Sequence, residues 1–386
     1  MRGPDSGVLS GNGRPEGLRV LMVSDTVGGV WTYSIELCRA FGEQGVEVLL
    51  AAVGDSITPA QTSEVDRLKG ATLLYKKAKL EWMEEPWDDV EKTVHWLQEL
   101  EDGFRPDVIH LNQYCYTSTG FCSPTLVVAH SCVYSWYEAV REGRPGAEWD
   151  EYQRRIAAGM AGATAVTGIS ESLLDGLEKW YGSYRRLPAV GNGRNVEAIR
   201  PAPKQPYILT AGRVWDEAKN IAVLSEAARN VEWPIRVAGE SVSPNGNASP
   251  DCSNLELLGQ LSREEMSSAM EQASVYICPA LYEPFGLAVL EAAAAGCALI
   301  LADIPSLRAN WEGAALFVPP RSERCWTNAV QQLVDDEIKL SRFGELARER
   351  AVSSRFSASS MAESYLKYYY NIISESGASR TAQFAL

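Results

Sequence analysis

The sequence lacks the features that mark several classes of protein. Its eight cysteines include no Cys-x-x-Cys pair, so neither a zinc framework nor a disulfide scaffold is expected. Cys278 and Cys297 lie in apolar runs and are interpreted as small buried side chains. No signal peptide opens the sequence, and no apolar run approaches the roughly 18 residues of a membrane span. We therefore expect a cytoplasmic protein without a transmembrane segment.

Positive charge is also scarce. Lys and Arg total 36 against 50 Asp and Glu, which gives a net charge of −14 at pH 7. Such a chain is not expected to bind nucleic acid or to be held on an anionic membrane by charge. The acidic pairs Asp88-Asp89 and Asp335-Asp336 do not follow strands, and no cluster of metal ligands emerges. Neither a metal nor another cofactor is expected.

What the sequence does have is a regular alternation of short apolar strands and helices. Residues 1–17 are polar and glycine-rich and are expected to form a disordered lead-in. The strands at 18–23 and 46–53, with a helix from Val30 between them, form a βαβ unit. Further strands are expected at 107–111, 125–130 and 163–169, and helices at 148–161 and 170–180. Apolar strands of this kind indicate a parallel sheet covered on both faces.

The alternation stops at residues 200–206, where three prolines predict an extended linker, and then resumes. The second series has expected strands at 207–211, 235–238, 255–258, 275–279, 298–302 and 315–318. A last helix at 357–373 and a loose tail at 374–386 follow. The predicted fold class is α/β, with two Rossmann-like doubly wound domains, 18–199 and 204–355. Because such sheets bind ligands at the carboxyl ends of their strands, we expect the domains to face each other across a cleft.

The most informative segment runs from Tyr282 to Ala292 and reads Tyr-Glu-Pro-Phe-Gly-Leu-Ala-Val-Leu-Glu-Ala. Pro284 favours the first turn of a helix, and Gly286 allows a ligand to approach the backbone. The amides of Phe285, Gly286 and Leu287 are then expected to be unpaired donors at a helix N-terminus. Such a position suits an anion, because the helix dipole adds to the amide donors.

Two acids, Glu283 and Glu291, lie on either side of this expected anion site. They would repel a bare phosphate, but they suit the hydroxyls of a sugar attached to it. A nucleotide sugar contains both parts. The alternative interpretation is that both acids are ordinary residues of a helix surface, favoured near its N-terminus by the dipole.

Other candidate ligand contacts also follow strands. Gly28-Gly29 leaves backbone amides accessible after the first strand, although the sequence Ser24–Val30 is not a dinucleotide fingerprint. Arg213 and Lys219 flank the loop after the first strand of the second series, where they are placed to bind a diphosphate. The alternative for these two cations is a surface ion pair with a neighbouring acid.

His130 ends a strand and is either a satisfied core residue or a donor of a hydrogen bond to a sugar hydroxyl or a leaving-group oxygen. His110 is a weaker candidate of the same kind. Gly259 ends another strand and is placed to expose backbone groups to a nucleotide base. The Asn192-Gly193 pair predicts a turn that borders the cleft. Three aromatic residues are assigned either to the core or to stacking on an acceptor: Tyr134, Trp136 and Tyr137.

Together these segments resemble the retaining glycosyltransferases of family 4, which have the GT-B fold. The resemblance covers residues 18–373 and is most specific in the Glu-x7-Glu segment. The other matching segments occur in the family's order: Gly28-Gly29, His130, Asn192-Gly193, Gly212-Arg213 with Lys219-Asn220, Leu258-Gly259 and Gly296.

The resemblance implies a role for each candidate. Glu283 is expected to contact the donor sugar and Glu291 the ribose, while Arg213 and Lys219 hold the diphosphate. The amides at 285–287 and around Gly29 are expected to assist them. His130 is expected near the transferred sugar, which makes it and Glu283 the candidate catalytic residues. The family needs no metal, transfers with retention by front-face attack, and packs its last helix on the first domain.

Two rival functions remain open at this point. A sugar-nucleotide epimerase of the same architecture would convert the donor without an acceptor, and a catalytically silent scaffold would keep only the fold. The chain departs from the family's pattern at Ser131, Asn195 and Ile304-Pro305. The sequence therefore names neither the base, nor the sugar, nor the acceptor, which is a sugar, a lipid-linked group or a small molecule. It does not name the oligomeric state.

Overall fold

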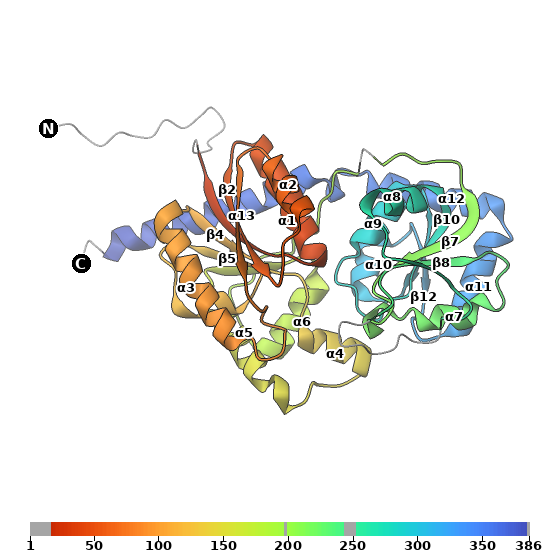
Figure 1. Ribbon diagram of the computed structural model, residues 1–386, viewed down its shortest axis with the longest axis horizontal. Coiled ribbons are helices and arrows are strands. Elements are labelled where there is room, and N and C mark those ends of the chain that lie inside the picture. The colour runs from red at the N-terminus through yellow and green to blue at the C-terminus, as the bar shows by residue number, and fades with distance from the viewer. Residues whose placement is uncertain (1–16, 197–198, 243–251, 384–386) are drawn as a thin grey trace.

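The structure is a computed structural model that describes residues 17–196, 199–242 and 252–383. The predicted lead-in at 1–17 lies outside these residues, apart from Gly17. The chain forms two α/β units that lie side by side, and the last helix runs along the first of them (Figure 1). The two units are called the first and the second domain below.

The first domain is built on a parallel sheet with the strand order β3-β2-β1-β4-β5-β6. Its strands are β1 (Arg19–Asp25), β2 (Glu47–Gly54), β3 (Ala71–Lys77), β4 (Val108–Leu111), β5 (Thr125–Ala129) and β6 (Ala165–Gly168). Five of them match expected strands, because their apolar residues are buried almost continuously. The sequence did not predict β3, an edge strand that alternates half-buried and exposed residues and pairs only with β2.

Helices cover both faces of this sheet. They are α1 (Gly28–Glu43), α2 (Pro59–Asp66), α3 (Trp87–Phe104), α4 (Val133–Arg141), α5 (Asp150–Gly162) and α6 (Glu171–Tyr181). The expected helices at 148–161 and 170–180 correspond to α5 and α6. The helix expected from Val30 begins two positions earlier, at Gly28, directly after the loop that ends β1.

The second domain repeats the arrangement with the order β12-β11-β10-β7-β8-β9. Its strands are β7 (Gln205–Ala211), β8 (Ile235–Ala238), β9 (Glu256–Gly259), β10 (Ala273–Cys278), β11 (Ala298–Ala302) and β12 (Leu316–Val318). Its helices are α7 (Ala222–Ala228), α8 (Arg263–Gln272), α9 (Leu287–Ala294), α10 (Pro305–Trp311), α11 (Glu323–Val334) and α12 (Glu337–Ala351). All six expected strands are present, and Cys278 and Cys297 are buried as expected.

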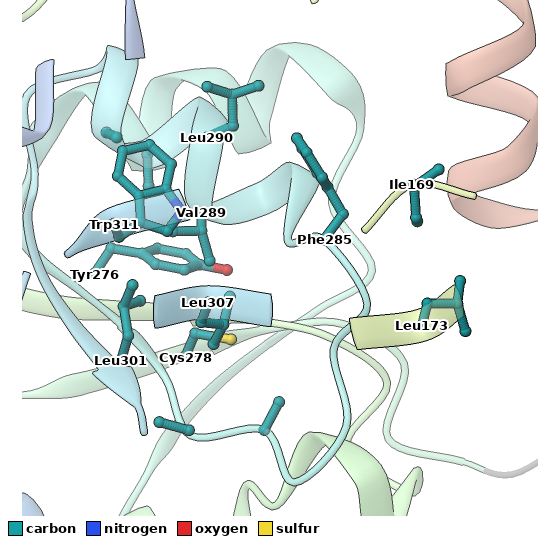
Figure 2. Close-up of a cluster of buried hydrophobic side chains, with 14 of the residues drawn as sticks. Ile169, Leu173, Tyr276, Cys278, Phe285, Val289, Leu290, Leu301, Leu307 and Trp311 are labelled. Atoms are coloured by element: carbon teal, nitrogen blue, oxygen red, sulfur yellow. The ribbon is translucent and has the colours of Figure 1, made fainter. Parts of the chain in front are cut away.

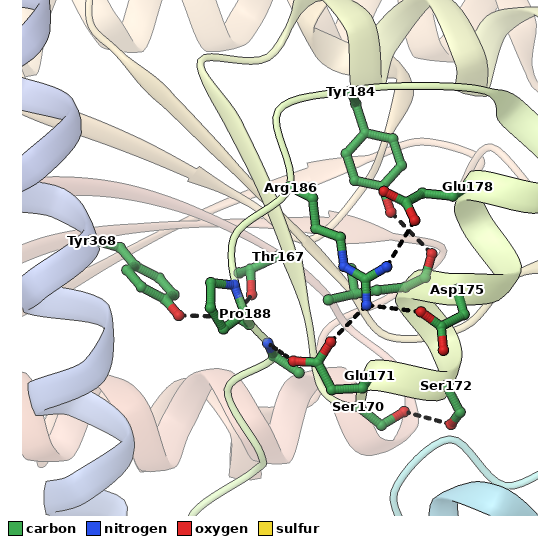
Figure 3. A network of polar contacts seen from close by, with 12 residues as sticks. Thr167, Ser170, Glu171, Ser172, Asp175, Glu178, Tyr184, Arg186, Pro188 and Tyr368 are labelled. Atoms are coloured by element: carbon green, nitrogen blue, oxygen red, sulfur yellow. Dashed lines mark hydrogen bonds and ion pairs between the residues drawn. The ribbon is translucent and has the colours of Figure 1, made fainter.

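The last helix, α13 (Ala358–Gln383), returns to the first domain and packs on α1 (Figure 1). Its side chains Met361, Tyr365, Leu366, Tyr369 and Ile372 belong to the apolar core on that side of the first sheet. The Tyr368 hydroxyl donates a hydrogen bond of 2.9 Å to the Pro188 carbonyl, beside the Arg186 guanidinium and its three acidic partners on α6 (Figure 3). The first domain is therefore completed by the end of the chain.

The prediction of a loose tail from residue 374 is wrong, since α13 continues to Gln383. Two contacts extend the helix past the expected end. Glu375 forms an ion pair with Arg185 of the first domain, and the Ser376 hydroxyl donates to the Ile372 carbonyl one turn back. The prediction rested on the polar composition of this segment, from which the ion pair with distant Arg185 cannot be inferred.

An apolar contact joins the domains beside the cleft. Figure 2 shows Phe285 between the cluster of the second domain around Trp311 and two residues of the first domain, Ile169 and Leu173. Phe285 is 3% exposed, and its ring lies 6.1 Å from that of Phe356. In both sheets the strand order reverses at one point, between β1 and β4 and between β7 and β10, which is where doubly wound sheets bind ligands.

Across the described ranges, no helix is long and apolar enough to cross a membrane. Within the same ranges, no three His, Cys, Asp or Glu side chains gather in a group that could hold a metal ion.

Candidate active site

A cleft of about 1030 Å³ lies where the two switch points face each other. The first domain contributes residues that follow β1 and β4, among them Asp25, Gly28 and Gln113. The second contributes residues that follow β7 and β10, among them Arg213 and Glu283. Most of the predicted site residues line this cleft: Gly28, Gly29, His130, Arg213, Lys219, Glu283, Phe285, Gly286 and Leu287.

An ion pair between Lys219 and Glu283 forms the charged centre of the second domain's wall. The Lys219 Nζ lies 2.7 Å from the Glu283 Oε2, and the two side chains are 25% and 19% exposed. Burial alone would raise the pKa of Glu283, but the charge of Lys219 and two backbone amides outweigh it and lower that pKa. Burial would likewise lower the pKa of Lys219, and Glu283 reverses the direction. Both groups are therefore ionised at neutral pH.

Arg213 is the second cation of this wall and is half exposed. Its Nη2 lies 2.6 Å from the Asp216 Oδ2, and its guanidinium stacks 5.0 Å from the ring centre of Trp215. The other Asp216 oxygen accepts a hydrogen bond from the Ala218 amide and so caps the turn that carries Lys219. One acid thus positions both cations, and Arg213 forms an ion pair with this neighbouring acid while it also lines the cleft.

The expected start of the helix at Pro284 is wrong. The helix α9 begins at Leu287, and Gly286 precedes it with φ of +89°, a conformation that excludes it from the helix and favours glycine. The Gly286 amide is not a free donor, because it donates a hydrogen bond of 3.0 Å to the Glu283 Oε1. The carboxylate of Glu283 thus caps its own loop while its other oxygen holds Lys219.

The Gly28-Gly29 turn of the first domain faces this helix start across the cleft. A Cβ atom on Gly29 would lie 3.7 Å from the Leu287 side chain, an ordinary van der Waals distance, so the turn lies close to the first residue of α9. Gly28 has a φ of +69° and begins α1. The N-termini of two helices, α1 and α9, therefore approach the same part of the cleft, and both favour negative charge there.

His130 belongs to a buried polar network rather than standing alone at a strand end. The Nδ2 of Asn112 donates to the Val23 carbonyl at 2.7 Å, which turns the Oδ1 of Asn112 toward the Nε2 of His130, also at 2.7 Å. The Nε2 of His130 therefore carries the proton. Burial, together with nearby His110, lowers the pKa of His130 to about 3, so the ring is neutral and its Nδ1 is an acceptor.

His110, the weaker candidate, lies inside the domain instead of in the cleft. Its Nε2 is 3.2 Å from the same Asn112 Oδ1, and its Nδ1 is 2.6 Å from the Tyr369 hydroxyl of α13. Burial lowers its pKa to about 3 as well. The interpretation of a strand-end histidine as a satisfied core residue is correct for His110.

Glu291 lines a second cavity, of about 540 Å³, between the same domains. Its carboxylate lies 2.9 Å from the Arg194 guanidinium, and burial raises its pKa while Arg194 acts in the opposite direction. Leu261, Ser262 and Arg263, directly after β9, line the same cavity. Gly259 lines neither cavity; its carbonyl accepts a hydrogen bond of 2.8 Å from the Gly239 amide.

Several residues of the site were missed by sequence reasoning. Asp25 is the last residue of β1 and Gln113 lies two positions after β4, so their place at the carboxyl ends of apolar strands was an available signal. Arg194 belongs to the turn around Asn192-Gly193, which was expected to border the cleft, and Asn192 lines it. Tyr282 gave no signal: its hydroxyl accepts a hydrogen bond of 3.0 Å from the Cys132 amide of the other domain.

Two protein-family models match most of the chain. Residues 27–198 match the profile of "Glycosyltransferase Family 4", and residues 194–350 match that of "Glycosyl transferases group 1". The two matches adjoin at the turn that carries Arg194. Together they include every residue of the two cavities that was named above except Asp25.

Individual relatives are more distant. The chain is 35% identical over 98 residues to the glycogen synthase of Mycobacterium tuberculosis, a stretch that covers 25% of this chain and 24% of the relative. The chain thus spans about a quarter of that relative's length. It is 24% identical over 294 residues to the alpha-maltose-1-phosphate synthase of the same species, with 64% of this chain and 73% of the relative covered.

Solved structures share the fold. The sucrose-phosphate synthase of Thermosynechococcus elongatus superposes with a TM-score of 0.77 at 18% identity, covering 93% of this chain and 100% of that one. The Anabaena protein HepE, solved in complex with UDP-glucose, gives a TM-score of 0.70 at 13% identity, covering 92% and 100%. The likeness to the sucrose-phosphate synthase confirms the GT-B fold that the sequence predicted.

Proposed function

The chain belongs to glycosyltransferase family 4, and we propose that it transfers a hexose from a nucleotide diphosphate sugar to an acceptor hydroxyl, with retention of anomeric configuration. The observation that carries the proposal is the Lys219–Glu283 ion pair at the switch point of the second domain, which faces the Gly28-Gly29 turn. It combines a cation for a diphosphate with a carboxylate for sugar hydroxyls. HepE, which has the same fold, was solved with UDP-glucose.

The donor is proposed to lie with its diphosphate on Lys219, Arg213 and the helix starts of α1 and α9. Its sugar reaches Glu283 and its nucleoside extends toward Glu291 in the second cavity. His130 would accept a hydrogen bond from a sugar hydroxyl at Nδ1, since its Nε2 proton is held by Asn112. The sequence predicted that this histidine donates a hydrogen bond, whereas in this proposal it accepts one.

In the proposed reaction the bond from the sugar anomeric carbon to the diphosphate oxygen breaks, and a bond from that carbon to the acceptor oxygen forms on the same face. The acceptor proton passes to the departing diphosphate oxygen. The cations and helix dipoles stabilise the charge that develops on the leaving group, which is the step that such preorganised groups accelerate most. Because these groups supply positive charge where it is needed, we propose that no divalent cation is required.

The experiment for this proposal begins with a thermal-shift screen of UDP-, GDP-, ADP- and TDP-glucose, since a ligand of the folded state raises the unfolding temperature. Release of nucleoside diphosphate from the best donor is then measured with and without EDTA. Free nucleoside diphosphate is the expected product. A sugar isomer that appears without free nucleotide would instead support an epimerase, and no shift with any donor would contradict the proposal.

Lys219→Ala tests the diphosphate contact. We expect the affinity for the matching nucleoside diphosphate to fall at least about tenfold, or about 1.4 kcal/mol, in calorimetry. The control is Lys92→Ala, which removes an exposed lysine of α3. Equal affinity of the Lys219 and Lys92 variants would remove Lys219 from the diphosphate site.

A further inference from the structure

The wall of the cleft that the first domain forms is rich in aromatic side chains, which suggests what kind of acceptor it binds. Six aromatic side chains line it: Trp82, Tyr114, Trp136, Tyr137, Trp149 and Tyr152. Trp82 is 46% exposed, an unusual state for so large an apolar side chain on a folded protein. An apolar surface of this kind inside a polar cleft is suited to a ligand with an apolar face.

The aromatic side chains of α4, of α5 and of Trp149 just before α5 form one continuous series. The ring centre of Trp136 lies 5.2 Å from that of Tyr137, which lies 6.1 Å from Trp149, which in turn lies 5.5 Å from Tyr152. Each pair meets edge to face, a favoured arrangement that fixes the ring planes. Tyr134, by contrast, is completely buried in the core. Of the three aromatic residues whose role the sequence left open, two therefore belong to the cleft and one to the core.

Charge on this wall is of one sign. Among the described residues that line the cleft, the first domain contributes two carboxyl groups, Asp25 and Glu81, and no Lys or Arg. The cations of the cleft, Arg213 and Lys219, come from the second domain and are each paired with an acid. A phosphate group on the acceptor would thus find no cation to pair with on the described part of this wall.

One hydrogen-bond acceptor of this wall has no partner within the part of the chain that the structure describes. Gln113 lines the cleft and is 3% exposed. Its Nε2 donates a hydrogen bond to the Asp25 Oδ1, whereas its Oε1 is buried and has no hydrogen-bond partner among the described residues. Buried polar atoms are nearly always hydrogen-bonded, so an unpaired one beside a cleft indicates a missing partner. Glu81 is already occupied, since it accepts hydrogen bonds from the Tyr114 and Cys115 amides.

Asp25 is suited to a neutral partner. Burial, with a smaller contribution from Glu81, raises the pKa of its carboxyl group to about 7, so that near neutral pH it both donates and accepts hydrogen bonds. A hydroxyl group matches this behaviour. A cationic group would require the ionised carboxylate, which this environment disfavours.

We propose that the acceptor is an uncharged carbohydrate that lies on the aromatic series of the first domain, with hydroxyls held by Asp25 and Gln113. The proposal rests on the transferase function above and adds the chemical class of its second substrate. One acceptor hydroxyl attacks the anomeric carbon and loses its proton to the departing diphosphate, as written for the overall reaction. The wall would reject the phosphate ester of the same sugar.

The test uses the full chain with its best donor and measures release of nucleoside diphosphate. Donor binding is measured first by thermal shift, because no shift with any donor would contradict the transferase function and this proposal together, and release without an added acceptor gives the background rate. Matched pairs are then added: glucose and glucose 6-phosphate, fructose and fructose 6-phosphate, and inositol and inositol 1-phosphate, with maltose and glucosamine alongside. We expect at least one neutral sugar to stimulate release above the donor-only rate and every charged compound to stimulate less.

Two results would overturn the acceptor proposal alone while donor binding persists. One is greater stimulation by a phosphate ester or by glucosamine than by the matched neutral sugar. The other is no stimulation by any neutral sugar. With the best neutral acceptor, Trp136→Ala should raise its KM about tenfold, which corresponds to about 1.4 kcal/mol. Trp136→Phe should raise it less, and Trp96→Ala, which removes a half-buried tryptophan of α3 outside the cleft, should leave it unchanged.

Discussion

Glu283 combines two tasks that usually fall to different residues. One oxygen caps the loop before α9 through the Gly286 amide, and the other holds Lys219. The loop conformation and the charge pattern of the cleft therefore depend on the same carboxylate. In the proposed reaction a sugar hydroxyl would compete with Lys219 for that oxygen, and the incoming diphosphate would provide Lys219 with a new anionic partner.

Gly193 shows at the residue scale how the turn beside the cleft depends on the absence of a side chain. A Cβ atom there would lie 2.2 Å from the Ser357 carbonyl oxygen, at the start of α13. We expect Gly193→Ala to lower the free energy of unfolding by about 1–3 kcal/mol, the usual range for overpacking. Urea denaturation measures the change.

Gly103→Ala is the matched control for that substitution. Gly103 is an exposed residue of α3, and no atom lies within 4 Å of the position of its Cβ. Since alanine favours a helix over glycine, this variant should be as stable as the wild type or more stable, by up to about 1 kcal/mol. Equal destabilisation of both variants would contradict the assigned contact of Gly193 with Ser357.

Residue-level predictions from the sequence succeeded where the signal was local. The position of Arg213 and Lys219 after a strand was enough to place them in the cleft. The sequence did not reveal that the Gly286 amide is already bonded, because that depends on how the Glu283 side chain folds back. It also did not reveal the position of Gln113 in the site, because a buried oxygen without a partner is recognised only from the atoms around it.

At the scale of elements, α13 is tied to the candidate site through a chain of hydrogen bonds. The Tyr369 hydroxyl donates to the Nδ1 of His110, and His110 shares the Asn112 side chain with His130. We expect Tyr369→Phe to cost about 1–3 kcal/mol of stability, because it leaves a buried imidazole nitrogen without a donor. Denaturant unfolding measures the loss.

The adjacent Tyr368 provides a control on the same helix. Its hydroxyl bonds the Pro188 carbonyl in an exposed position (Figure 3), where water can replace it. Tyr368→Phe should therefore cost about 1 kcal/mol or less. A loss in the Tyr369 variant no larger than in the Tyr368 variant would show that the Tyr369 hydroxyl is not required by His110.

The same network predicts a pH dependence of stability. The pKa of His130 is about 3 in the folded protein, below the ordinary value of 6.5. Between these values the unfolded chain binds the extra proton, so this residue's contribution to stability is present above pH 6.5 and is lost as pH falls toward 3. The stability difference between the wild type and His130→Gln should therefore shrink as pH is lowered from 7 to 4. A constant difference across this range would contradict the assignment of a neutral buried ring.

The sequence predicted most elements because buried parallel strands are apolar almost throughout. It failed for β3, an edge strand with a polar exposed side, and for the end of α13. In both cases a partner elsewhere in the chain decides the structure. β3 pairs with β2, and Glu375 of α13 pairs with Arg185.

At the scale of the whole molecule, polar contacts bridge the domains around the cleft. Arg263 of α8 pairs with Glu64 of α2 at 3.0 Å, and Arg141 of α4 pairs with Glu217 at 2.7 Å. The members of these pairs are 199 and 76 positions apart in the sequence, so no local pattern predicts them. The repeated alternation of strands and helices predicted the two domains, and the carboxyl ends of their strands predicted the cleft between them, whereas the ion pairs that join the domains needed the structure.

We propose that the protein cleaves a nucleotide sugar in this cleft with the help of Glu283. The most direct measurement compares release of nucleoside diphosphate by the wild type, by Glu283→Gln and by Glu264→Gln, an exposed control on α8. Removing a charge that acts on the transition state should lower kcat about a hundredfold or more in the first variant and leave the second unchanged. Turnover by Glu283→Gln close to that of the wild type would contradict the account.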